Sequence, residues 1–289
     1  MMSVIFILGA GFMGAGIAQV CAQSGHRVHL MDSDPEAIKK SVDSINWSLD
    51  KFSEKGLLME PSKSIADRIT VEVELEKATT ADWIIEAVFE NLDLKLKIFE
   101  ELDRVVSSRT LIATNTSSIP VSRLAEATGT PERVLGLHFF GPVPFMELVE
   151  VVKGAKTSDI VFHQGIEFVK SLGKIPLKVH QDIPGFVVNR IFGAAFRECV
   201  HLVAEGVASV EDIDAGMRLG YGWNIGPFEI ADNAGLDTFA RVGETMLALG
   251  EDHLVAKPDF IKNMVKDGRL GKKVGRGFYR YGKDGKKIE

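Results

Sequence analysis

Three polar side chains beside apolar runs have the chemistry needed for acid–base catalysis. His138 follows one apolar run, Glu150 interrupts another, and Ser117 lies in the polar segment Asn115–Ser118 that follows a third. A carboxylate among valines is costly to bury without a partner, so Glu150 needs a donor, which His138 could supply. The imidazole would then be fixed by one ring nitrogen and made more basic at the other. This combination is typical of proton removal from an alcohol, because histidine side chains titrate near neutral pH.

Each of these side chains also has an ordinary structural interpretation. His138 could be a hydrogen-bonded histidine of the core, and Glu150 could belong to a structural ion pair. Ser117 could be the hydroxyl of a turn or of a helix cap. The residues by themselves leave both interpretations open.

An acceptor for the hydride of such an alcohol is indicated near the N-terminus. The apolar run Val4–Leu8 leads directly into a G-x-G-x-x-G turn and then into a helical pattern. In this arrangement Gly9 takes the tight turn, Gly11 lets a pyrophosphate approach the backbone, and Gly14 lets the helix pack closely on the strand. The cofactor-binding turn that we predict comprises Gly9, Ala10, Gly11, Phe12, Met13 and Gly14.

A carboxylate for the ribose of this cofactor follows the next apolar run. The run Arg27–Met31 ends in Asp32, roughly 20 residues after the glycines, where a carboxylate accepts the ribose hydroxyls. Because this carboxylate repels a 2′-phosphate, the sequence favours NAD over NADP. The alternative is the glycine turn of some other α/β protein, with Asp32 as a helix cap.

The composition is that of a globular protein without a polyanionic partner. The 289 residues are 45% hydrophobic and 26% charged, which suits one large domain or two. The net charge of -6 argues against binding to nucleic acid or anionic membranes, and no apolar run approaches membrane-spanning length. Cys21 and Cys199 show no metal-ligand spacing, so we expect buried free thiols and no metal. The chain enters its first strand at once, which favours a cytoplasmic location.

Apolar runs and helical patterns alternate along the first part of the chain, which predicts a Rossmann-type, doubly wound, mainly parallel α/β sheet. A ligand of such a sheet lies beyond the carboxyl ends of the strands, where Ser117 and His138 fall. Between Pro35 and Arg68 the pattern predicts an inserted helical hairpin, which is either substrate surface or a packing device. The expected strands are Val4–Leu8, Arg27–Met31, Ile69–Val71, Trp83–Val88, Leu111–Thr114, Val134–Leu137, Leu148–Val152 and Ile175–Val179.

The remaining sequence reads as helical. It predicts a long helix over 186–205, a capping-box start at Ser209, and a further helix that begins at Pro227. The basic segment 271–277 is either an ordered turn or a solvated tail. The predicted domains are residues 1–183, which bind the dinucleotide, and residues 184–289, which are all-α.

These motifs make the chain similar to the 3-hydroxyacyl-CoA dehydrogenases, including the bacterial 3-hydroxybutyryl-CoA type, over nearly its whole length. The segments that carry the resemblance are Gly9–Ala18, Asn115–Ser118, His138–Pro144, Leu148–Val151, Pro184–Arg190, Glu211–Asp214, Gly226–Glu229 and Gly277–Tyr279. The resemblance implies NAD and an acyl-CoA substrate, held between a Rossmann domain and a helical domain that forms a homodimer.

The resemblance also assigns roles to individual residues. His138 would be the general acid/base, and Glu150 would orient it. Ser117 and Asn189 would bind the reacting oxygen and help to position the acyl group, while the glycine turn and Asp32 would hold NAD. Further residues near NAD would be Glu90, Lys95 and Lys273, and the residues that meet coenzyme A would be Ser48 and Lys55. The alternatives are solvated charges for the first three and a polar helix face for the last two.

One position departs from the pattern of these dehydrogenases. They usually have asparagine three residues after the histidine, where this chain has Gly141. The glycine lacks the amide of asparagine, so one hydrogen-bond donor and one acceptor near the nicotinamide are lost and space opens there. We therefore expect the acyl-group preference or the turnover to differ from that of these dehydrogenases.

The resulting hypothesis is reversible, NAD-dependent oxidation of an (S)-3-hydroxyacyl-CoA to the 3-oxoacyl-CoA, in fatty-acid β-oxidation or a short-chain acyl-CoA pathway. One alternative keeps the fold and oxidises a free hydroxy acid or sugar acid. A third hypothesis is a nucleotide-binding structural protein without turnover, as lens crystallins related to these dehydrogenases suggest.

Overall fold

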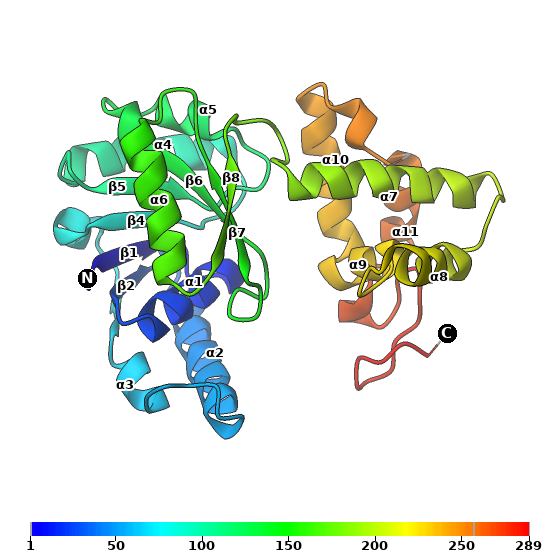
Figure 1. Cartoon of the computed structure of the whole chain (residues 1–289), viewed down its shortest axis with the longest axis horizontal. Helices are drawn as coiled ribbons and strands as arrows, with labels where there is room; N and C mark the ends of the chain where they lie inside the picture. The colour runs from blue at the N-terminus through cyan, green and yellow to red at the C-terminus, as the bar shows by residue number, and fades with distance from the viewer. Residues whose placement is uncertain (1, 257, 289) are drawn as a thin grey trace. The chain divides into compact units, whose positions relative to one another are not determined.

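The computed structural model describes residues 2–256 and 258–288 and divides the chain into two compact units (Figure 1). The first unit comprises residues 1–186 and the second residues 187–289. Each unit has its own core of buried apolar side chains. No helix among the described residues is both long enough and apolar enough to cross a membrane.

The first unit is built on one eight-stranded sheet with the order β3-β2-β1-β4-β5-β6-β7-β8. The strands are β1 (Val4–Leu8), β2 (Arg27–Met31), β3 (Ile69–Glu72), β4 (Trp83–Glu86), β5 (Leu111–Thr114), β6 (Val134–Phe139), β7 (Leu148–Val152) and β8 (Ile175–Val179). Every neighbouring pair is parallel except β6 and β7, which are antiparallel. The predicted doubly wound, mainly parallel sheet is therefore confirmed, and its strand order reverses between β1 and β4, where such sheets bind ligands.

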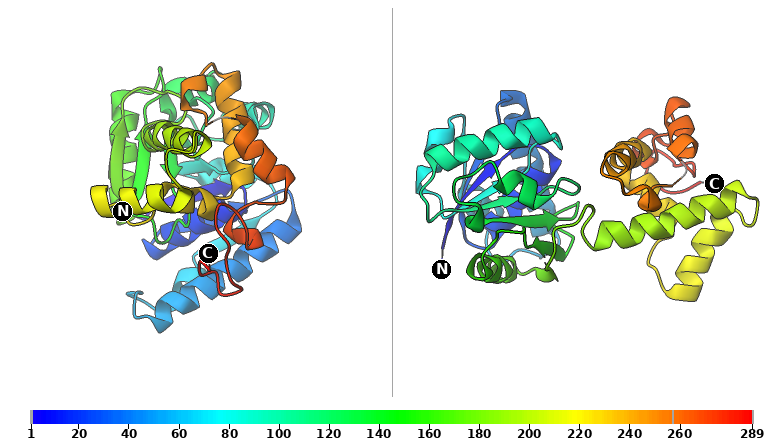
Figure 2. Two further views of the ribbon diagram at one scale, coloured as in Figure 1. Left: turned by 90° about the vertical axis from the view of Figure 1, so that its right-hand side faces the viewer. Right: turned by 90° about the horizontal axis from the view of Figure 1, so that it is seen from above.

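Helices lie on both faces of this sheet (Figure 2). They are α1 (Phe12–Gln23), α2 (Pro35–Glu54), α3 (Ser62–Ala66), α4 (Leu92–Val105), α5 (Val121–Ala125) and α6 (Asp159–Ser171), with 3-10 turns η1 (Leu75–Thr80) and η2 (Pro131–Arg133). Because both faces are covered, β4, β5 and β6 are buried along their whole length, and most of their residues are apolar.

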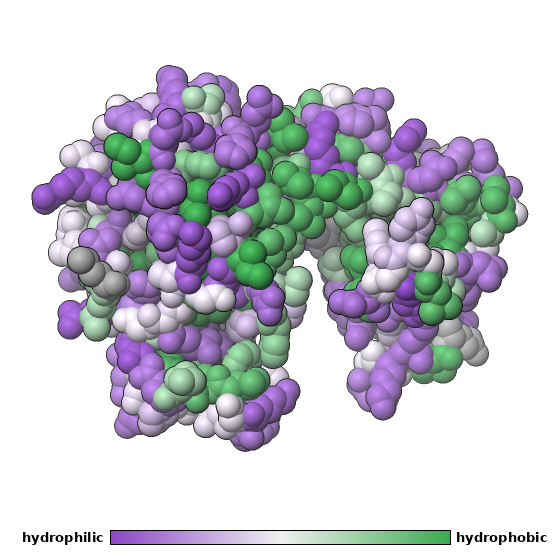
Figure 3. All heavy atoms as spheres, viewed as in Figure 1, coloured by the Kyte–Doolittle hydropathy of each residue, from purple (hydrophilic) through white to green (hydrophobic). Residues whose placement is uncertain are grey.

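The predicted helical hairpin consists of α2 and α3. The carboxylate of Asp34 accepts a hydrogen bond from the N–H of Glu36 at 2.9 Å, and Pro35 is the first residue of α2. The helix ends before Gly56, whose φ of 65° suits glycine. Apolar side chains gather over this hairpin in Figure 3, and Trp47 and Met59 are among the exposed ones.

The second unit is helical. Its helices are α7 (Val188–Ala204), α8 (Val210–Tyr221), α9 (Pro227–Ala234), α10 (Leu236–Ala248) and α11 (Pro258–Lys266), with 3-10 turns η3 (Asp252–Leu254) and η4 (Lys272–Val274). The hydroxyl of Ser209 accepts the N–H of Asp212 at 3.0 Å, so the predicted cap of α8 is present. Phenylalanine rings from several helices and from the tail pack together in its core.

Two buried aspartates hold the C-terminal tail on these helices. The carboxylate of Asp232 accepts the N–H groups of Phe278 at 2.8 Å and Tyr279 at 2.9 Å, and the hydroxyl of Tyr281 at 3.0 Å. Asp214 accepts the hydroxyl of Tyr279 at 2.8 Å. The basic segment before these residues is therefore an ordered turn, closed by a bridge between residues 271 and 276.

Replacing Asp232 by Ala should destabilise the protein. The substitution leaves the buried donors of Phe278, Tyr279 and Tyr281 without their acceptor, so the free energy of unfolding should fall by at least about 2 kcal/mol. Urea unfolding measures this change. Asp284→Ala is the control, because Asp284 is exposed and should change stability by less than about 0.5 kcal/mol; equal effects of the two variants would contradict the interpretation.

Candidate active site

The antiparallel pairing of β6 and β7 places His138 directly opposite Glu150. Opposed residues of two strands project from the same face of a sheet, so the two side chains meet. Nδ1 of His138 lies 2.6 Å from Oε2 of Glu150, and the side chains are 7% and 0% exposed. The contact that the sequence suggested is therefore present. It uses Nδ1 of the imidazole ring and leaves the other ring nitrogen, Nε2, outside this contact.

His138 lies inside a strand and not just past its end. The sequence pattern placed the end of the strand at Leu137, but β6 continues to Phe139 because Phe139 pairs with Val149 of β7. Two aromatic rings then line the imidazole: the ring centroids of Phe140 and Phe186 lie 4.6 and 5.6 Å from that of His138. The imidazole is thus held by one hydrogen-bond partner, Glu150, in largely apolar surroundings.

The three glycines of the N-terminal turn have different environments. Gly9 has a φ of 100°, and a Cβ atom there would lie 2.6 Å from the carbonyl oxygen of Ala87. A Cβ atom at Gly14 would lie 1.7 Å from the carbonyl oxygen of Gly9. The first and third glycines are therefore required by the packing of the protein itself. Gly11 has no atom within 4 Å of its Cβ position, so its lack of a side chain leaves room for a ligand at the N-terminus of α1.

Asp32 is held beside this turn by backbone donors. Its Oδ2 accepts the N–H of Ala10 at 2.7 Å, and its Oδ1 accepts the N–H of Asp34 at 3.0 Å. Each carboxylate oxygen keeps further acceptor capacity, which a ribose hydroxyl could use. The open space at Gly11, the N-terminus of α1 and this fixed carboxylate together fit a dinucleotide.

The turn that carries Ser117 is organised by Glu90. Oε1 of Glu90 accepts the N–H groups of Ser117 at 3.1 Å and Ser118 at 3.0 Å, and the hydroxyls of Thr116 at 2.6 Å and Ser118 at 2.8 Å. Burial alone would raise the pKa of Glu90, but the ammonium of Lys95 and these hydrogen bonds outweigh it and lower the pKa to about 2.

Lys95 is buried behind this carboxylate. Its side chain is 1% exposed, and its Nζ lies 2.7 Å from Oε1 of Glu86 and 3.2 Å from Oε2 of Glu90. The side chain of Glu90 is 34% exposed, so of the two only Glu90 offers substantial surface to a ligand. The expected place of both residues near NAD stays a prediction.

Two polar residues of this edge were given no role of their own in the sequence analysis. Glu86 is fully buried and accepts the Lys95 ammonium and the hydroxyl of Thr114 at 2.7 Å each. Asn115 accepts the N–H of Phe139 at 2.9 Å and so joins the ends of β5 and β6. In the sequence, Glu86 interrupts the apolar run 83–88, as Glu150 interrupts the run 148–152. The same argument that pointed to Glu150 could therefore have identified Glu86.

The remaining predicted residues lie elsewhere in the two units. Ser48 is half-buried on α2, and Lys55 is exposed at the end of that helix. In the second unit, Asn189 is exposed in the first turn of α7, and Nζ of Lys273 lies 2.6 and 2.7 Å from the two carboxylate oxygens of Asp237.

Gly141 is packed against the glycine turn. A Cβ atom at Gly141 would lie 2.6 Å from Cε1 of Phe12 and 3.3 Å from Sδ of Met13. The open space expected from the missing side chain is therefore not found, because the ring of Phe12 occupies it. This ring is 69% exposed.

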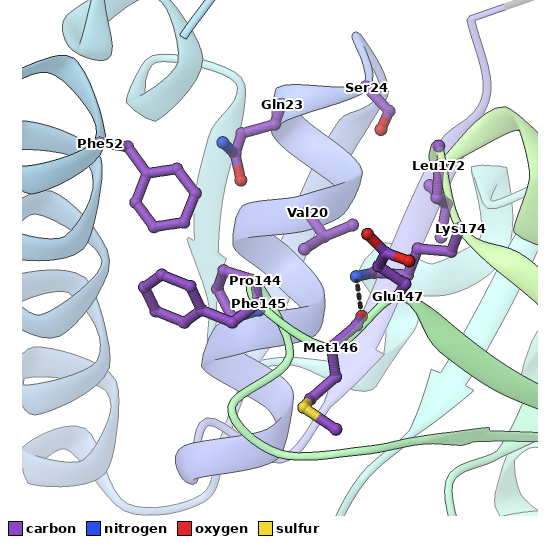
Figure 4. A pocket seen from close by; sticks show the side chains of 11 residues that line it. Val20, Gln23, Ser24, Phe52, Pro144, Phe145, Met146, Glu147, Leu172 and Lys174 are labelled. Carbon is purple, nitrogen blue, oxygen red and sulfur yellow. Dashed lines mark hydrogen bonds between the residues drawn. The ribbon is translucent and has the colours of Figure 1, made fainter. Parts of the chain in front are cut away.

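A separate cavity of about 200 Å³ lies between α1, α2 and the loop that precedes β7 (Figure 4). Nζ of Lys174 donates to the carbonyl oxygens of Val143 at 2.8 Å and Met146 at 2.6 Å, and burial lowers the pKa of Lys174. Lys174 thus anchors the loop that follows Gly141. None of the predicted site residues lines this cavity.

A doubly wound sheet whose first turn fits a dinucleotide, with a histidine–carboxylate pair at the same edge, defines the class of nicotinamide-dependent dehydrogenases. Residues 4–183 match the model of the 3-hydroxyacyl-CoA dehydrogenase NAD-binding domain, and residues 185–281 match that of the C-terminal domain. The chain belongs to the 3-hydroxyacyl-CoA dehydrogenase family, and it is an NAD-dependent dehydrogenase.

Relatives and solved structures cover the chain almost completely. It is 41% identical to the probable 3-hydroxybutyryl-CoA dehydrogenase of Deinococcus radiodurans, over 95% of this chain and 99% of that protein. It is 39% identical to the mitochondrial hydroxyacyl-coenzyme A dehydrogenase of Rattus norvegicus, over 96% of this chain and 90% of that protein. The structure of (S)-3-hydroxybutyryl-CoA dehydrogenase from Ralstonia eutropha is similar with a TM-score of 0.90 and 40% identity, covering 98% of this chain and all of that one.

Replacing Glu90 by Gln should remove a pH-dependent part of the stability. The pKa of Glu90 falls from its ordinary 4.5 to about 2 on folding, so the charged form stabilises the fold fully above pH 4.5, and this contribution is lost as the pH falls toward 2. Urea unfolding at several pH values measures the difference between wild type and Glu90→Gln. That difference should shrink as the pH falls through this range; a difference that does not change with pH would contradict the role of the charge.

Replacing Gly141 by Ala should weaken NAD binding by displacing the ring of Phe12. Because that ring is exposed and can rotate, the free energy of unfolding should change by less than about 1 kcal/mol. NADH titration measures the affinity of the variant. Affinity should return in the double variant Phe12→Ala with Gly141→Ala, which has no ring to displace, and purely additive effects would contradict the coupling.

Proposed function

We propose that this protein reversibly oxidises an (S)-3-hydroxyacyl-CoA to the 3-oxoacyl-CoA, with His138 as the general acid/base. The observation that carries the proposal is the 2.6 Å contact between Nδ1 of His138 and Oε2 of Glu150. It fixes the tautomer that leaves the lone pair of Nε2 for the substrate hydroxyl. The names of the relatives, 3-hydroxybutyryl-CoA and hydroxyacyl-coenzyme A dehydrogenases, support the choice of substrate class.

In the proposed reaction Nε2 of His138 takes the proton of the substrate hydroxyl, and the carboxylate of Glu150 stabilises the imidazolium that forms. NAD, when bound, supplies the acceptor for the hydride of the carbinol carbon. Ser117 and Asn189 bind the reacting oxygen and position the acyl group. In the reverse direction His138 returns the proton to the carbonyl oxygen.

The other predicted residues hold the two large ligands in this proposal. The glycine turn binds the pyrophosphate, and Asp32 binds the adenosine ribose. The residues near NAD are Glu90, Lys95 and Lys273, and the residues that meet coenzyme A are Ser48 and Lys55. The space at Gly11 and the backbone donors that fix Asp32 support the first two assignments.

We further propose that two copies associate through the second unit, as the resemblance implies. Several large apolar side chains of this unit are exposed, among them Ile191, Leu219 and Tyr221 at 64, 88 and 82%. Exposed apolar side chains become buried when they contribute to an interface between two copies, which favours the second unit for this contact. Fatty-acid β-oxidation or a short-chain acyl-CoA pathway is the proposed setting.

Replacing His138 by Gln should remove turnover and leave cofactor binding intact. Loss of the general acid/base, which donates the proton in this direction, should lower kcat for acetoacetyl-CoA reduction by about 10²–10⁴-fold, because glutamine cannot transfer a proton. NADH absorbance measures turnover, and a fluorescence titration measures NADH affinity. His163→Gln, at an exposed histidine of α6, is the control and should behave as wild type.

Two results would end the proposal. Turnover of His138→Gln close to that of wild type would exclude the histidine as the general acid/base. Equal use of free acetoacetate and of acetoacetyl-CoA by the wild type would instead favour a dehydrogenase of free hydroxy acids, because binding of the coenzyme A part should contribute to catalysis.

A further inference from the structure

We propose that Phe186 is a positioning residue: its ring fixes the tilt of the His138 imidazole and keeps water from the contact between His138 and Glu150. The proposal rests on the proposed function of His138 as the general acid/base. Phe186 lies between β8 and α7 and is 1% exposed. Its ring centroid lies 5.6 Å from that of the imidazole, with the two ring planes inclined by 57°.

The backbone of Phe186 is the first observation that needs an explanation. Its φ is 47°, and among residues 2–256 and 258–288 it is the only residue other than glycine with a positive φ. This left-handed region brings the Cβ atom of an L-residue too close to the following carbonyl oxygen, so only glycine adopts it freely. A strained residue persists where its surroundings impose the conformation, and such residues gather at functional sites.

The turn before Phe186 explains the conformation of its neighbour only. The N–H of Phe186 donates to the carbonyl oxygen of Ile183 at 3.0 Å, which closes a turn with Pro184 and Gly185 at its centre. Proline followed by a residue of positive φ is typical of a type II turn, and Gly185 has a φ of 74°. Phe186 is the last residue of this turn, a position that does not require a positive φ. Its conformation therefore follows from where its ring is packed.

The imidazole needs a second restraint because the carboxylate holds only one of its atoms. Nδ1 of His138 lies 2.6 Å from Oε2 of Glu150, and the χ2 torsion of histidine is broad, so one hydrogen bond leaves the ring free to tilt. The rings of Phe140 and Phe186 contact the imidazole at centroid distances of 4.6 and 5.6 Å. Phe140 is half-buried, whereas Phe186 is buried. Of the two rings, that of Phe186 is therefore the one that excludes water beside the imidazole.

A purely structural role for Phe186 predicts a different result. Loss of core packing alone would lower the free energy of unfolding and leave catalysis by the folded enzyme unchanged. Loss of a positioning role would lower kcat while NADH still binds, because the imidazole is misaligned only for the chemical step. The proton between Nδ1 of His138 and Glu150 gives a measure that needs no turnover, since it exchanges with water faster once the ring no longer shields it.

The test compares Phe186→Leu with Phe168→Leu. Phe168 is the control because it is also buried, at 6% exposed, but stacks on Trp83, the first residue of β4, at the opposite edge of the sheet. In Phe186→Leu we expect kcat for acetoacetyl-CoA reduction to fall by about 10–100-fold, with an unchanged NADH affinity. The low-field proton resonance of Nδ1, assigned by its absence from His138→Gln, should exchange faster with water. Phe168→Leu should match wild type in all three measurements. Wild-type kcat and exchange in Phe186→Leu, or equal losses in both variants, would overturn the proposal.

Two further variants test the strain and serve if Phe186→Leu does not fold. Phe186→Gly relieves the left-handed conformation, whereas Phe186→Ala keeps a Cβ atom in it. Urea unfolding should therefore find Phe186→Gly more stable than Phe186→Ala, and the reverse order would overturn the argument from strain. Phe186→Gly also lacks the ring, so it should show the same loss of kcat and the same faster exchange.

Failure of the proposed function is a separate result. It would appear as wild-type protein that binds NADH but does not reduce acetoacetyl-CoA. The exchange of the Nδ1 proton still decides the role of Phe186 in that case: faster exchange in Phe186→Leu or Phe186→Gly supports it, and unchanged exchange overturns it.

Discussion

A carboxylate that is buried at the carboxyl edge of the sheet has to be paired, and much of the site follows from this constraint. Glu150 is paired by the imidazole of His138 across an antiparallel strand pair. Glu86 is paired by the ammonium of Lys95, which also lies next to Glu90. In each case a hydrogen bond or ion pair offsets the cost of burying the carboxylate, and the same contact fixes the position of the partner side chain.

A buried carboxylate also stabilises the second unit, where its partners are hydrogen-bond donors. Asp232 is fully buried and accepts two backbone N–H groups and a tyrosine hydroxyl of the tail. Burial raises the pKa of Asp232, and the hydrogen bonds act against that rise. The hydrogen bonds to Asp232 fix residues 278–281 on the helices and so hold the tail, which also carries Lys273, in one conformation.

The three glycines of the N-terminal turn do not all have the same structural reason to be glycine. Gly9 and Gly14 are glycines because the backbone of the protein itself passes too close for a side chain. Gly11 is not constrained in this way, and the open space at its Cβ position is compatible with the pyrophosphate that we propose for this turn. Phe12, from the same turn, packs beside Gly141, two residues after the end of β6, and so links the glycine turn to the strand that carries His138.

The sequence by itself determined the local elements and the class of protein. Helix caps and most strands follow from short-range patterns, since the residues concerned are close in the chain. The tertiary structure alone decided that His138 lies within a strand, that Lys95 is buried between two carboxylates and that Phe12 fills the space at Gly141. These facts depend on strand register and on contacts between distant segments, which no local pattern encodes.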